Sequence, residues 1–167
     1  MQREYNIGDI VLYAAHGCCE VEDIEMRDTG IYYVLHPLKR LRTRFYVPAD
    51  NQELMAKVRP LPTPKALEET IDQVASSEPE WIEDVSVRRD TAREVLASGD
   101  EHDVLMLLRG FHNQKKQAAG SGKRLLTSDA SILRAVQDHV RDEFSLVLDI
   151  EPHEVDQLLA DRMGHGQ

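Results

Sequence analysis

The sequence "RPLPTPK", residues 59–65, separates a strand-like part of the chain from a helical part. Its three prolines cannot donate to a β-ladder, and they cannot continue a helix. Hydrophobic residues recur with a period of two before this segment and with a period of 3.6 after it. The change predicts an α+β protein of two domains, at residues 1–58 and 65–167, joined by a proline-rich linker at residues 59–64.

Short β-branched and aromatic runs fill residues 8–48. In chain order they read GDIVLYA, GCCEVEDIEMR, GIYYVLHPL and RLRTRFYVP. The connections between them are short and carry Gly and Asp, which favours antiparallel hairpins. Four or five such strands within about fifty residues are typical of a small SH3-like antiparallel β-barrel.

The helical part carries apolar residues at helical spacing, which predicts an all-α bundle of about five helices. Thr63 can cap a first helix that has Pro64 at its first position and Leu67, Ile71 and Val74 on one face. A second helix is expected from about Ser86 to Ser98, ending at Gly99. Asp100 can cap a third helix and Ser128 a fourth, and Pro152 opens a fifth.

Composition limits the classes of protein to which this chain can belong. It has 167 residues, 41% of them hydrophobic, and a formal charge of −10. No apolar run is long enough to cross a bilayer and the first residues do not resemble a signal peptide, so we predict a cytoplasmic protein with no membrane partner. The negative charge argues against non-specific nucleic-acid binding over the whole surface but permits a local contact.

Several patterns that could indicate chemistry do not reach the required spacing. Cys18 and Cys19 are adjacent, which disfavours a disulfide and fits no zinc motif. The sequence "GSGKR", residues 120–124, has Gln117 where a phosphate loop needs its first glycine, so we interpret it as a flexible loop. No nucleophile has the sequence context of a catalytic site. We therefore expect no enzymatic activity, metal, cofactor or small-molecule ligand.

The sequence "LKRLRTRFYVP", residues 38–48, alternates basic and apolar side chains. In a strand, one face would carry Arg40, Arg42, Arg44 and Tyr46, and the other Leu41, Thr43, Phe45 and Val47. The basic face could be a solvated outer surface over a buried inner one, or it could bind a partner.

Trp81, the single tryptophan, precedes three arginines of the second predicted helix. It could cover the core of the bundle, or it could anchor a partner or a DNA base step. The arginines, which are Arg88, Arg89 and Arg93, could pair with neighbouring carboxylates or contact phosphates.

Four segments of the first part, taken in order, resemble the N-terminal module of the CarD/CdnL family of bacterial transcription regulators. They are YNIGDIVLYAAHGCCEVEDIEMR (5–27), YYVL (32–35), FYVPADN (45–51) and VRPL (58–61). The second part is similar to the family's helical domain, through the SGD cap (98–100) and the late DEFSLVL (142–148). The resemblance implies a Tudor-like or SH3-like domain that binds the β subunit of RNA polymerase. It also implies a helical domain that reaches promoter DNA and alters open-complex formation or stability without catalysis.

The resemblance also assigns roles to individual residues. The strand from Arg40 to Val47 would extend a sheet of the polymerase. The residues that would bind the polymerase are Arg27, Arg40, Arg42, Arg44 and Tyr46. The candidates for DNA binding, which come from the residues themselves, are Trp81, Arg88, Arg89 and Arg93. Counting back from the shared SGD places Val85, rather than Trp81, at the position of the family's DNA wedge.

The residues alone permit a second hypothesis, in which the chain is a protein-interaction module. The same strand would then hold another acidic protein, and the helical domain would not contact DNA. Binding to promoter DNA that depends on polymerase distinguishes the two hypotheses.

Overall fold

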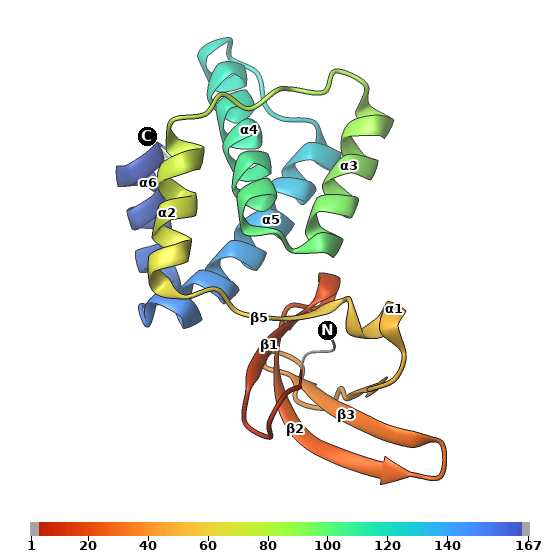
Figure 1. Ribbon diagram of the computed structural model, residues 1–167. Coiled ribbons are helices and arrows are strands. Elements are labelled where there is room, and N and C mark those ends of the chain that lie inside the picture. Colours follow the sequence, from red (N-terminus) through yellow and green to blue (C-terminus); the bar gives the residue numbers. More distant parts are fainter. Residues whose placement is uncertain (1–3, 165–167) are drawn as a thin grey trace. The chain divides into compact units, whose positions relative to one another are not determined.

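The structure, a computed structural model, describes residues 4–164 and divides the chain into two compact units (Figure 1). The first unit ends at Leu61 and the second begins at Pro62, so the boundary falls within RPLPTPK. An antiparallel sheet forms the first unit and helices form the second, which confirms the predicted α+β class.

The first unit is a five-stranded antiparallel sheet in the order β4-β3-β2-β1-β5. Its strands are β1 (Ile10–Tyr13), β2 (Cys18–Arg27), β3 (Gly30–Pro37), β4 (Phe45–Pro48) and β5 (Val58–Pro60). A 3-10 turn, η1 (Ala14–His16), follows β1, and a short helix, α1 (Gln52–Met55), precedes β5. β4 and β5 lie at the two ends of the order, so closure of the sheet into a barrel stays a prediction.

A β-bulge in β2 decides which of its side chains reach the core of this sheet. Cys19 and Val21 are fully buried, and the register against β3 then shifts between Val21 and Asp23. Because one extra residue reverses the alternation, Ile24 packs against the core, and Glu25 and the other outward positions of β2 lie on the opposite face.

The predicted strand from Arg40 to Val47 is wrong for its first five residues. Arg40 N–H donates to the carbonyl of Pro37 at 3.2 Å, and Thr43 N–H donates to the carbonyl of Arg40 at 3.0 Å. These bonds close two successive turns, and Leu41, expected to face inward, is 76% exposed. Only β4 keeps the predicted alternation, with Val47 buried and Tyr46 exposed.

Two residues of the predicted linker belong to the sheet instead. In β5, Arg59 is paired with Leu12 and Pro60 with Val11 of β1. Pro60 is compatible with this position because β5 is an edge strand, where a missing donor leaves no ladder bond unmade.

Within residues 62–164, the second unit contains five helices, as the sequence predicted. They are α2 (Pro64–Ala75), α3 (Val85–Ser98), α4 (Glu101–Gly120), α5 (Thr127–Leu148) and α6 (Pro152–Met163). Thr63 Oγ1 accepts from Ala66 N–H at 3.1 Å, and Asp100 accepts from Asp103 N–H at 3.0 Å, so both predicted caps are confirmed. The predicted cap at Ser128 is wrong, because α5 begins at Thr127, so Ser128 lies inside the helix, and the N-cap residue Leu126 forms no side-chain cap.

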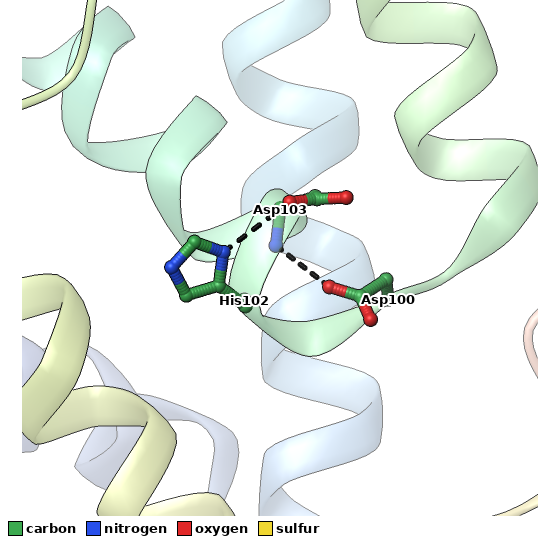
Figure 2. A group of neighbouring side chains, drawn as sticks. All are labelled: Asp100, His102 and Asp103. Atoms are coloured by element: carbon green, nitrogen blue, oxygen red, sulfur yellow. Dashed lines mark hydrogen bonds and ion pairs between the residues drawn. The ribbon is translucent and has the colours of Figure 1, made fainter.

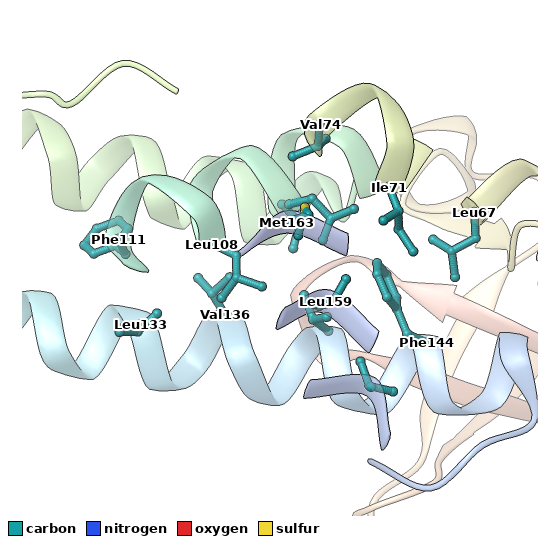
Figure 3. Close-up of a cluster of buried hydrophobic side chains, with 14 residues drawn as sticks. Leu67, Ile71, Val74, Leu108, Phe111, Leu133, Val136, Phe144, Leu159 and Met163 are labelled. Atoms are coloured by element: carbon teal, nitrogen blue, oxygen red, sulfur yellow. The ribbon is translucent and has the colours of Figure 1, made fainter. Parts of the chain in front are cut away.

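The apolar faces of α2, α4, α5 and α6 meet in one core (Figure 3). Leu67, Ile71 and Val74 of α2 are fully buried, as their spacing predicted. The other side chains of this core are Val104, Leu105, Leu108, Phe111, Leu133, Val136, Val140, Phe144, Val155, Leu159 and Met163. Among residues 4–164, no helix is both long enough and apolar enough to cross a membrane.

Candidate functional site

The outer edge of β4 is available for pairing with another chain. β4 forms its ladder with β3 alone, and no other strand within residues 4–164 pairs with it. An unpaired edge presents a row of backbone donors and acceptors that an extended partner segment can use.

A stacked cation lies on the outer face of the sheet beside this edge. The guanidinium carbon of Arg27 lies 4.8 Å from the ring centroid of Tyr46 and 5.0 Å from that of Tyr32. Glu25 accepts from Arg27 Nη2 at 2.6 Å, and this hydrogen bond is the main cause that raises the pKa of Arg27. We call these four residues, Glu25, Arg27, Tyr32 and Tyr46, the Arg27 cluster.

The pairing of three strands brings the Arg27 cluster together. Tyr32 is opposite Glu25 on β2, and Val34, two residues further along β3, is opposite Tyr46 on β4. Arg27 and Tyr46, two of the predicted polymerase-binding residues, are therefore neighbours. Sequence reasoning missed Tyr32, whose signal is that it alternates with the buried Tyr33 and so faces outward.

Two apolar side chains are exposed near the end of the β2–β3 hairpin. Met26 of β2 is 85% exposed, and its register partner Ile31 of β3 is also exposed. Alternation places Met26 on the face opposite to that of Arg27. Sequence reasoning did not select this pair, although an apolar residue beside a turn is a recognisable signal.

Arg40, Arg42 and Arg44, which were predicted to share one face of a strand, do not form a common surface. Arg44 donates to both carboxylate oxygens of Glu22, and its Nη1 donates to the carbonyls of Leu41 and Thr43. Its guanidinium is therefore committed within the unit. Arg40 and Arg42 are exposed, and neither forms an ion pair with another described residue.

The interpretation of Arg88 as a DNA contact needs correction, because the side chain is buried. Arg88 is 5% exposed and Asp129 is 3% exposed, and they are joined by two hydrogen bonds of 2.9 and 2.7 Å. Nη1 of Arg88 also donates to the carbonyls of Ile82 and Glu83. All of these contacts hold the segment before α3 against α5, so the guanidinium is not available to a phosphate.

Trp81 packs within the helical unit. Its ring lies edge-on to Phe111 with the centroids 5.1 Å apart, and the guanidinium carbon of Arg88 lies 4.4 Å from the ring centroid. The side chain is half-buried. These contacts favour the interpretation of Trp81 as a cover of the bundle core.

The other two predicted DNA-binding arginines are exposed on α3. Arg93 forms an exposed ion pair with Asp90 at 3.5 Å, and Arg89 forms none with a described residue. Val85, the first residue of α3, is 41% exposed. Val85, Arg89 and Arg93 are spaced by four residues, so they follow one stripe of the helix.

Three polar side chains gather at the start of α4 (Figure 2). Potential ligand atoms of Asp100, His102 and Asp103 lie within 4.8 Å of one another. Asp100 accepts from the backbone of Asp103, and His102 Nδ1 lies 3.2 Å from the Asp103 carboxylate. Such contacts are those of a helix N-terminus, and we assign the group to the cap of α4.

Comparison with protein families gives a match over the part of the chain that holds β1 to β5. A model described as the CarD-like/TRCF RID domain matches residues 5–59. The N-terminal unit belongs to this CarD-like family. The match confirms the resemblance seen in the first part of the chain, and a CarD-like domain indicates a transcription-related protein that interacts with RNA polymerase. A search of curated proteins found no match.

The Arg27 cluster and the edge strand β4 both lie within the CarD-like domain. The helices α2 to α6 lie beyond the matched residues. The match therefore concerns the first unit alone, and a role for the second unit must be argued from its own residues.

Proposed function

We propose that the protein is a non-catalytic transcription regulator that binds the β subunit of RNA polymerase. It modulates the formation or stability of the promoter open complex from that position. The observation that carries this proposal is the coincidence of a CarD-like match with an unpaired edge strand, β4, beside the Arg27 cluster.

Two kinds of contact would combine at this interface. Backbone groups of β4 pair with an edge strand of the polymerase, which supplies affinity with little dependence on sequence. Arg27 and Tyr46 supply specificity, because stacking on two rings holds the guanidinium in place before binding and so limits the entropy lost. Arg40 and Arg42 add positive charge beside the same edge, so the matching surface of the partner is acidic.

Replacing the stacked cation tests this interface. We expect Arg27→Glu to weaken binding to a polymerase β-lobe fragment at least about tenfold, since it removes a central cation and introduces a like charge to the acidic partner. The measurement is biolayer interferometry with the full chain. The matched control is Arg89→Glu, an exposed site on α3 with the same change in charge. Equal losses in both variants, or unchanged binding by Arg27→Glu, would contradict the proposed interface.

We also propose that the stripe of Val85, Arg89 and Arg93 on α3 contacts promoter DNA. The stripe is exposed, it carries two cations, and the resemblance places Val85 at the family's wedge position. Insertion of an apolar side chain at a base step, flanked by arginines on phosphates, is a known way to hold bent or melted DNA. The acidic character of this unit makes such a contact depend on recruitment by the polymerase.

Gel-shift titration of forked promoter DNA with polymerase tests the DNA contact. We expect the wild type to stabilise the complex, and Arg89→Ala to remove a phosphate contact, reduce that gain about threefold to tenfold and lower its salt dependence. Lys65→Ala, an exposed cation on α2, is the control and should leave the gain unchanged.

The alternative function is an interaction module that holds another acidic protein and does not contact DNA. It is favoured by the excess of 21 acidic over 12 basic side chains in residues 62–167. A wild-type protein that binds the β fragment but gives no polymerase-dependent gain on DNA would support a module without DNA contact. Failure to bind the β fragment would overturn the polymerase proposal itself.

A further inference from the structure

A basic cavity lies in the helical unit, although that unit is acidic as a whole. Residues 104–128 include no Asp or Glu, and the next acidic side chain, Asp129, is paired with Arg88. Three cations of this region, together with Arg134 of α5, line one hollow of about 530 Å³ between the end of α4 and the start of α5. The four cations are Lys115, Lys123, Arg124 and Arg134, and we call the hollow the α4–α5 cavity.

The remaining walls of the α4–α5 cavity are mostly apolar. They are formed by Ala119, Leu125, Ala130, Leu133 and the amide side chain of Gln137. No carboxylate is among the described residues that line it, and none of its four cations forms an ion pair with another described residue. Burial is the main cause that lowers the pKa of His112, and the positive charge of Lys115 lowers it further. No ion pair among the described residues therefore neutralises the positive charge of the cavity.

The loop GSGKR takes part in this cavity in a way that its sequence did not predict. Its backbone amides are already used, because Ser121, Gly122 and Lys123 N–H groups donate to carbonyls of the last turn of α4. A phosphate loop would need those amides for its ligand. Here an anion would be bound by the side chains of Lys123 and Arg124 instead.

We propose that the α4–α5 cavity binds a small phosphorylated ligand with an apolar or aromatic part, of which a nucleotide is the simplest example. Its volume lies in the range of small-molecule sites, about 300–1,000 Å³. Four cations match the charge of two or three phosphate groups, and the apolar wall matches a flat ring. A concave site of this kind surrounds a small molecule, whereas the backbone of a double helix is contacted from one side. The site lies outside the matched CarD-like domain, so this proposal does not rest on the polymerase proposal.

Titration of the full ¹⁵N-labelled chain with ATP, without added metal, tests the proposal by NMR. We expect saturable shifts concentrated in residues 115–137 and a Kd below about 1 mM. Lys123→Ala and Arg134→Ala should each weaken ATP binding at least about fivefold, since each removes a charge-assisted contact. The matched control is Lys116→Ala, which removes the same charge on α4 next to a lining residue, and it should change the affinity less than twofold. Circular dichroism checks that every variant is folded.

Two further titrations separate the possible ligands. Inorganic pyrophosphate should compete with ATP but bind more weakly, because it cannot use Leu125 and Leu133. Equal affinities of pyrophosphate and ATP would overturn the role of the apolar wall. An absence of saturable shifts with ATP, an equal loss in Lys116→Ala, or shifts of these residues with duplex DNA alone would overturn the small-ligand site. Binding of the polymerase β fragment is measured separately, so failure of one proposal leaves the other open to its own test.

Discussion

Arg88→Ala should lower the free energy of unfolding of the helical unit by about 3–5 kcal/mol, the cost of breaking a buried ion pair by removing one partner. The substitution leaves the Asp129 carboxylate buried without its two hydrogen bonds from the guanidinium. It also removes Arg88 Nη1, the donor that the carbonyls of Ile82 and Glu83 share in the wild type. Urea denaturation followed by far-ultraviolet circular dichroism measures the change.

Two control variants test whether the buried charge causes this loss. Arg89→Ala removes the neighbouring exposed arginine of α3 and should change stability by less than about 0.5 kcal/mol. Replacing both partners, with Arg88→Met and Asp129→Leu together, should recover much of the loss, because no unpaired charge is then buried. A loss below about 1 kcal/mol in Arg88→Ala would show that the pair does not stabilise the fold as we describe.

Phe144→Ala should destabilise the helical unit by about 3–5 kcal/mol, through lost burial and the cavity left behind. The ring is among the largest fully buried side chains, and it projects from α5 into the core shared with α2 and α6 (Figure 3). Leu146→Ala is the matched control, because Leu146 lies two residues away on the same helix and is exposed. Similar losses in the two variants would contradict the assignment of Phe144 to the core.

The chain supplies a separate optical signal for each unit in these experiments. Trp81, the single tryptophan, contacts Phe111 in the helical unit, whereas all five tyrosines precede residue 47. Tyrosine absorbance should therefore report the sheet. Arg88→Ala and Phe144→Ala should shift the unfolding transition seen by tryptophan fluorescence and leave the transition seen by tyrosine absorbance in place.

Those parts of the fold that depend on neighbouring residues could be predicted from the sequence. Thr63, Asp100 and Gly99 act within four residues of themselves, through caps and a left-handed turn, and all three predictions are confirmed. The burial of Leu67 and Ile71 follows from helical spacing in the same way.

The errors arose where a distant residue decides the structure. Alternation between Arg40 and Arg44 resembles a strand, yet the chain turns there and Arg44 reaches back to Glu22 on β2. Nothing near Arg88 distinguishes it from Arg89, because its partner Asp129 lies 41 residues further along the chain.

Only part of the candidate site could be predicted from the sequence, because its contacts also depend on distant residues. Arg27 and Tyr46 were selected through the family resemblance, but their stacking depends on the register of β2, β3 and β4. Tyr32 completes the cluster and could be found only once its outward face was known. The α4–α5 cavity likewise requires two helices to bring Lys115 and Arg134 to one hollow.

The hydrophobic cores of the two units share no residue. Each core is packed from side chains of its own unit, so natural selection can act on the halves as separate heritable parts. Recombination between Leu61 and Pro62 would exchange a whole sheet or a whole bundle without dividing either interior. Descendants of this chain could therefore acquire new helical partners while retaining the ancestral sheet.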